Sequence, residues 1–303
     1  MSIARISWHG WPDCFQIRNG LIEAVIIPSL GRVMQLRLLD DPVGAFWRNA
    51  ALDGQLHASP VDLLIPLEWH NFGGDKCWPA SQSDWPKVQG REWPPPDAFD
   101  SQPMNAVATE LSVTLTSAVD RSFGIQIVRL VELDPRLRVM RIRTEFRKVA
   151  GGPVKVGIWT ITQLQDPECV AILLSPQSKF ANGYTRLMSA QPANLKIDGA
   201  VLSLARHPHE LVKIGSDGTS LAWVGPNCVV RIDAESGPGE YPDGGSITQV
   251  YTNPDPLQYV ELETAGPLTI MRIGDRIERT TVYSVSPRST PDPHSEARKA
   301  LTL

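Results

Sequence analysis

Cysteines are scarce in this sequence, and their spacing forms no metal or redox motif. Only four occur in 303 residues, and no two of them make a Cys-x-x-Cys pair. This pattern is not that of a disulfide scaffold or a structural zinc site, so we predict free thiols. His207 and His209 are close in sequence but lack a nearby third ligand, and we therefore predict no metal site and no cofactor.

Long apolar runs and basic runs are also missing. Nowhere do about 18 apolar residues follow one another, and the first residues contain no apolar stretch of signal-peptide length. The formal net charge is −4 and no lysine- and arginine-rich run occurs, so nothing favours a nucleic-acid backbone or an anionic membrane. We expect a cytoplasmic monomer or homodimer that binds neither nucleic acid nor a membrane.

Helical periodicity is almost absent, and turn residues are abundant instead. The chain has 26 prolines and 23 glycines, and between them lie short runs that alternate or are rich in β-branched residues. The clearest of these runs are residues 21–27, 111–116, 125–133, 154–158, 221–224, 229–232 and 269–273. Regular short strands predict an all-β sandwich or barrel, with helical turns only at about 60–64 and 293–300.

No linker or internal repeat divides the chain into separate cores. With 42% hydrophobic residues it can build one large core. We predict a single domain over residues 1–288, followed by a loosely ordered C-terminal tail over residues 289–303.

The segment 66–104 breaks the strand rhythm and contains Trp69, Trp78, Trp85 and Trp93. Its lack of alternation predicts a long loop, and long loops in compact domains are usually functional or disordered. Disordered segments are poor in aromatic residues, so we expect an ordered, functional loop.

Several short motifs, in their order along the chain, resemble those of the galactose-mutarotase-like superfamily, which includes the aldose 1-epimerases. The resemblance covers about residues 10–285. It is carried by the first hairpin (19–36), Gly73-Gly74 in place of His-Gly-Gly or Arg-Gly-Gly, the Trp-Pro at 78–79, the glutamate strand (259–264) and the closing hairpin (273–283). The stretch 71–79 also resembles the uncharacterised DUF4380 branch.

This resemblance implies a fold and a chemistry. The fold is a supersandwich of large twisted antiparallel sheets that binds a sugar across a concave face. Glu263 matches the family's catalytic base, but residues 154–163 lack the family's acid histidine, and Phe72 replaces a sugar-contacting histidine or arginine. His70 or Lys76 would then have to supply the acid.

The pattern around Glu263 is informative without the resemblance. Glu261 and Glu263 are two residues apart, so on a strand they share a face at about 7 Å separation. Two carboxylates at such a distance can flank a sugar, and opening an aldose ring requires a base and an acid. The alternative is a solvated polar face of a half-buried strand.

Further candidates would bind the sugar rather than react with it. Glycines admit close backbone approach, a lysine can bind a hydroxyl or an anionic group, and tryptophan faces suit a pyranose. Besides Glu263, Glu261 and His70, the predicted site contains Asn71, Gly73, Gly74, Asp75, Lys76, Trp78, Trp85, Trp93, Trp159, Gln163 and Tyr259. Some of the tryptophans could instead only plug the end of the sandwich.

These observations support a cofactor-independent, epimerase-like enzyme acting on a sugar or sugar acid. A non-catalytic sugar-binding or sensing protein is the alternative, and a lyase or hydrolase on the same fold is a third hypothesis. Serine-nucleophile elbows, P-loops and dinucleotide fingerprints are absent from the sequence.

Overall fold

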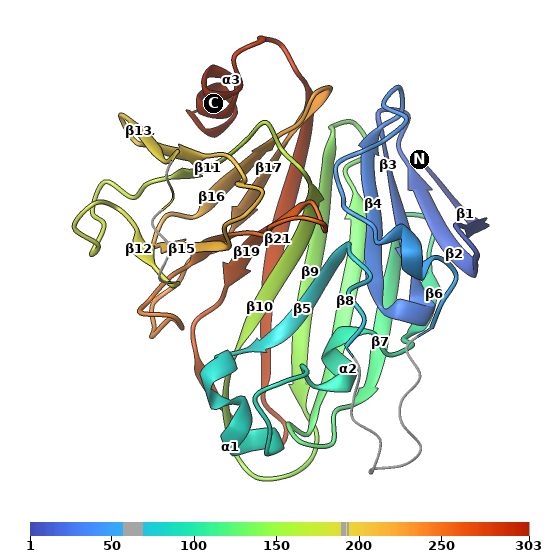
Figure 1. Cartoon of the computed structure of the whole chain (residues 1–303). Coiled ribbons are helices and arrows are strands. Elements are labelled where there is room, and N and C mark those ends of the chain that lie inside the picture. The colour runs from blue at the N-terminus through green and yellow to red at the C-terminus, as the bar shows by residue number, and fades with distance from the viewer. Residues whose placement is uncertain (57–68, 189–191, 193, 303) are drawn as a thin grey trace.

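Two large antiparallel sheets stack face to face and enclose the core (Figure 1). The computed structural model describes residues 1–56, 69–188, 192 and 194–302. One continuous apolar core contains residues of both sheets, such as Ile127 of the second and Leu262 of the first. The all-β supersandwich predicted from the sequence is confirmed.

The first sheet has eleven strands in the described part of the chain. In order across the sheet they are β1 (Ser2–Trp8), β2 (Trp11–Arg18), β3 (Ile22–Ile27), β4 (Arg32–Leu38), β5 (Asp75–Ala80), β10 (Val154–Gln165), β19 (Tyr259–Ala265), β18 (Thr248–Thr252), β15 (Val212–Ser216) and β12 (Thr185–Arg186), with β20 (Thr269–Met271) also paired to β10.

Ten described strands form the second sheet. In order they are β13 (Lys196–Asp198), β14 (Val201–Leu204), β11 (Cys169–Leu173), β16 (Ser220–Val224), β17 (Cys228–Ala234), β21 (Arg276–Pro287), β9 (Val139–Lys148), β8 (Ile125–Leu133), β7 (Ser112–Val119) and β6 (Asn105–Ala108). Strand β8 shows the predicted alternation clearly, because every second residue is buried against the first sheet.

Strand β5 corrects the prediction that residues 66–104 form one long loop. It lies between β4 and β10 in the middle of the first sheet (Figure 1). All six of its residues are buried, so the alternation that would reveal a half-exposed strand is missing. The rest of the described segment is loop with short helices.

The described helices are few and short. They are α1 (Trp85–Gln89), α2 (Asp97–Asp100), α3 (Pro293–Thr302) and the 3-10 turns η1 (Pro28–Leu30), η2 (Ala50–Leu52) and η3 (Gln82–Asp84). None of these helices is long and apolar enough to cross a membrane. The helical turn expected at 60–64 lies outside the described residues.

The C-terminal segment is not the loosely ordered tail that we expected. Helix α3 packs on β11 and β16 of the second sheet (Figure 1). Its residues Ala297 and Leu301 are buried in a small apolar cluster. Glu296 accepts hydrogen bonds from Ser289 and Thr290, which fixes the connection that leads into the helix.

An ion pair in the core joins the two sheets behind the candidate site. Asp75 of β5 forms a fully buried ion pair with Arg129 of β8. The Asp75 carboxylate also accepts hydrogen bonds from the Thr162 hydroxyl at 2.7 Å and the Tyr283 hydroxyl at 2.5 Å. Asp75, predicted to bind substrate, therefore faces the interior between the sheets and serves the core.

Candidate functional site

Strand β19 brings the two candidate carboxylates to the outer face of the first sheet. Val260 and Leu262 point into the core between the sheets. Glu261 and Glu263 therefore project from the opposite, outer face, which is turned away from the second sheet. Gln163 on the neighbouring strand β10 donates to Glu261 with its amide at 2.8 Å.

Glu263 is fully buried although it lies on this outer face. Its Oε2 accepts a hydrogen bond from the Trp159 indole at 2.8 Å and forms an ion pair with Lys213 Nζ at 3.0 Å. Its Oε1 has no partner among the described residues. Burial raises the pKa of Glu263 to about 7; the Lys213 charge lowers it and the Glu261 charge raises it further.

Lys76 reaches the same face from β5. Ile161 of β10 pairs with Lys76 on one side and with Glu263 on the other, which places the two Cα atoms about 10 Å apart, two strand spacings. The buried Lys76 Nζ has no hydrogen-bond partner in the described part of the chain. It lies 4.3 Å from the ring centroid of Trp78 and 5.2 Å from that of Trp69.

The surroundings of Lys76 make its ammonium group more acidic than that of an exposed lysine. Burial lowers the pKa of Lys76 to about 8, and the nearby Arg32 charge acts in the same direction, while Glu261, Glu263 and an aspartate oppose it. Glu263 and Lys76 thus form a carboxyl and amino pair with pKa values near neutrality, as acid–base catalysis requires.

Other buried polar atoms near this pair also lack partners within the described residues. They are Gln163 Oε1, Gln249 Oε1, Asn71 Oδ1 and Trp69 Nε1. Gln249 of β18 pairs directly with Glu263, so its side chain shares the outer face. Because buried polar groups are normally hydrogen-bonded, such a concentration indicates a place for a polar ligand or ordered water.

The tryptophans divide into two groups. Trp78 and Trp159 lie edge to face at 5.4 Å beside Lys76 and Glu263. Trp93 is 45% exposed and packs against Trp78, so it lies at the rim of the candidate site. Trp85 is fully buried and donates to the Pro79 carbonyl, a structural role that differs from its predicted one in sugar binding.

Gly73 and Gly74 are needed for packing within the chain. Both have a positive φ, +97° and +73°. A Cβ on Gly73 would lie 2.2 Å from the Trp47 carbonyl, and one on Gly74 would lie 2.5 Å from the Val33 carbonyl. The close approach predicted for a ligand is therefore made by the protein's own backbone.

His70, Asn71 and Tyr259 lie at one side of the site. The Tyr259 ring is 4.6 Å from that of Trp47, and Asn71 is close enough to Tyr259 to lower its pKa, although burial raises it far more. His70 contacts Phe72 at 5.9 Å between ring centroids.

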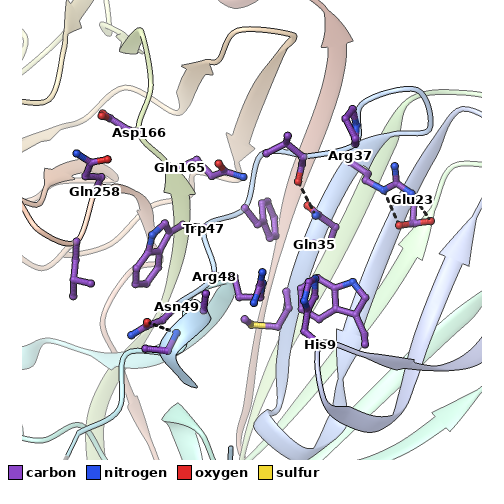
Figure 2. A pocket seen from close by; sticks show the side chains of 18 of the residues that line it. His9, Glu23, Gln35, Arg37, Trp47, Arg48, Asn49, Gln165, Asp166 and Gln258 are labelled. Atoms are coloured by element: carbon purple, nitrogen blue, oxygen red, sulfur yellow. Dashed lines mark hydrogen bonds and ion pairs between the residues drawn. The ribbon is translucent and has the colours of Figure 1, made fainter. Parts of the chain in front are cut away.

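A wide cleft of about 1070 Å³ opens beside this region (Figure 2). Figure 2 shows Trp47 between Gln258 on one side and the Arg37–Glu23 ion pair on the other. Since Trp47 also contacts Tyr259, it forms the boundary between the cleft and the predicted site residues.

Sequence reasoning missed Lys213 and Gln249. Lys213 lies on β15 and Gln249 on β18, and neither stands in a recognisable motif. In the described part of the chain, no group of three or more His, Cys, Asp or Glu side chains could hold a metal ion.

Comparisons with known proteins support the fold. No family model and no curated protein sequence matches this chain. A galactose mutarotase-like protein from Lactobacillus casei superposes with a TM-score of 0.59 at 9% identity, over 90% of this chain and 100% of that one. A candidate aldose 1-epimerase from Klebsiella pneumoniae superposes with a TM-score of 0.58 at 9% identity, over 99% of this chain and 86% of that one.

A galactose mutarotase related enzyme from Lactobacillus acidophilus gives a TM-score of 0.51 at 9% identity, over 92% of this chain and 99% of that one. These structures share the fold of this chain, so the fold that the resemblance implied is confirmed. The DUF4380 branch stays a prediction.

Proposed function

We propose that the chain binds an aldose or a sugar acid on the outer face of the first sheet and catalyses a cofactor-independent, epimerase-type proton transfer. The observation that carries this proposal is the buried pair of Glu263 and Lys76, with pKa values of about 7 and about 8. Each side chain keeps an unpartnered polar atom among the described residues.

The reaction needs two proton transfers. Glu263 Oε1 takes the proton of the anomeric hydroxyl, and the Lys76 ammonium gives a proton to the ring oxygen as the C1–O5 bond breaks. Rotation about the C1–C2 bond and closure on the other face of the aldehyde give the second anomer, and both protons return.

The surrounding residues fit a sugar. Trp78 and Trp159 present apolar faces to the C–H groups of a pyranose. The side-chain carbonyl oxygens of Gln163 and Gln249 have no hydrogen-bond partner among the described residues and can accept from sugar hydroxyls. Lys76 replaces the histidine that family members use as the acid, whereas His70 contacts Phe72 and remains the second candidate.

A sugar-binding protein without catalysis is the alternative. The observation in its favour is the ion pair between Glu263 and Lys213 at 3.0 Å, which could hold the carboxylate as an anchor for hydroxyl groups. In that case the two pKa values would have no catalytic use.

The Glu263→Gln variant separates the two functions. If Glu263 is the base, turnover of the preferred aldose, followed by polarimetry, should fall at least about 100-fold. Binding, followed by tryptophan fluorescence, should change far less, because a transition-state interaction is lost. Glu261→Gln is the matched control and should retain most turnover.

Two results would contradict the enzymatic proposal. Wild-type protein that binds sugars but turns over none of a panel of aldoses and uronic acids, and that loses binding on Glu263→Gln, would be a binding protein. If neither turnover nor binding responded to Glu263→Gln, the carboxylate would have no role at a sugar site.

A further inference from the structure

A second pocket, of about 290 Å³, opens beside β21 and the turn after β19. Arg279, Ile158 and Gly266 form its buried floor, while Glu235 and Ser236 stand on its exposed rim. Ile158 belongs to the core between the sheets, so this pocket is separate from the outer face that carries Glu263.

Arg279 is almost completely buried, with 5% of its surface exposed. No carboxylate of a described residue lies within ion-pair distance of it, and its Nε and Nη2 have no hydrogen-bond partner among those residues. These two nitrogens point their N–H bonds in parallel along one edge of the guanidinium. That edge is the one that holds a carboxylate or phosphate through two hydrogen bonds.

The buried position of Arg279 lowers the stability of the fold unless an anion pairs with its charge. Burial lowers its pKa, and the nearby Tyr241 and Glu235 oppose this effect. An arginine nevertheless remains charged in proteins, and an unpaired buried charge destabilises the fold. Glu235 and Glu278 line the pocket, but the Glu235 carboxylate accepts a hydrogen bond from the Thr280 backbone at 3.0 Å.

We propose that this pocket binds the carboxylate or phosphate group of a small organic anion, held side-on by Nε and Nη2 of Arg279. The volume suits a compact ligand rather than a polymer. This site operates independently of the sugar site.

Isothermal titration with sodium acetate and with inorganic phosphate tests the proposal, at ionic strength held constant with sodium chloride. Wild-type protein should bind at least one of the two anions saturably. Arg279→Met should weaken binding at least about tenfold, and Arg279→Lys should weaken it less, because lysine keeps the charge but loses the two-pronged geometry. Arg276→Met, a surface change on the same strand, should leave binding unchanged.

The proposal is overturned if chloride competes equally, if wild-type protein binds neither anion, or if Arg279→Met binds as tightly as wild type. The Ser236→Trp variant gives a second test of anion binding, which does not depend on whether an Arg279 variant folds. It fills the rim from an exposed loop position and should abolish binding with Arg279 intact; unchanged binding would place the anion elsewhere.

Discussion

The burial of Glu263 should make the stability of the protein depend on pH in a way that one substitution removes. The pKa of Glu263 is raised from 4.5 to about 7, so folding favours its protonated form. The contribution of Glu263 to stability is therefore greatest below the pKa that this residue has in the unfolded chain. It is lost as the pH rises from 4.5 through 7. A difference of about 2.5 in pKa corresponds to about 3 kcal/mol.

Glutamine imitates the protonated acid in shape and charge. Glu263→Gln should therefore raise the free energy of unfolding by about 3 kcal/mol at pH 8.5, but only by about 1 kcal/mol at pH 5. The interaction with Lys213 is already contained in the pKa of Glu263 and needs no separate correction. Functional sites commonly sacrifice stability in this way.

Urea unfolding at the two pH values measures the effect. Glu240→Gln is the control, since the side chain of Glu240 is 67% exposed and its replacement should change stability by less than about 0.5 kcal/mol at either pH. A gain of equal size at both pH values, or a loss at pH 8.5, would show that Glu263 is charged throughout and refute the burial argument.

Three further predictions concern the core, the reaction and the C-terminal helix. Asp75→Asn should cost about 3–5 kcal/mol of stability in urea unfolding, because it leaves the Arg129 charge buried and unpaired; a cost below about 1 kcal/mol would contradict the sheet-joining role. The kcat/KM for a turned-over aldose should peak between pH 7 and 8, since Glu263 must lose its proton and Lys76 must keep one; a plateau from pH 6 to 9 would exclude this pair. Leu301→Asp should lower the melting temperature by several degrees, because it buries a charge under α3, whereas a free tail would tolerate it.

Much of the fold could be predicted from local patterns. The alternation of residues 125–133 identifies β8 because one of its faces is polar and the other packs in the core. Strand β5 escaped prediction because both of its faces are buried, so its sequence lacks the alternation of a half-exposed strand. Helix α3 escaped in part, since the prolines around it resemble those of a loose tail.

The site could be predicted only where its signal is local. The spacing of Glu261 and Glu263 places them on one face of any strand. Lys213, by contrast, is 50 residues from Glu263 and meets it only because β15, β18 and β19 are neighbours in the sheet. Pairings between distant strands leave no mark in the residues around either partner, so neither the burial of Glu263 nor its counter-ion could be foreseen.

The arrangement of β5 has a consequence for how this protein can change. Asp75 and Lys76 are adjacent, yet Asp75 holds the sheets together and Lys76 faces the outer surface. Inserting or deleting one residue within β5 would exchange the two charges and spoil both faces together. Replacing Lys76 or Trp78 would alter only the outer one. Selection could thus retune ligand preference at every second position of this strand while the intervening positions keep the scaffold intact.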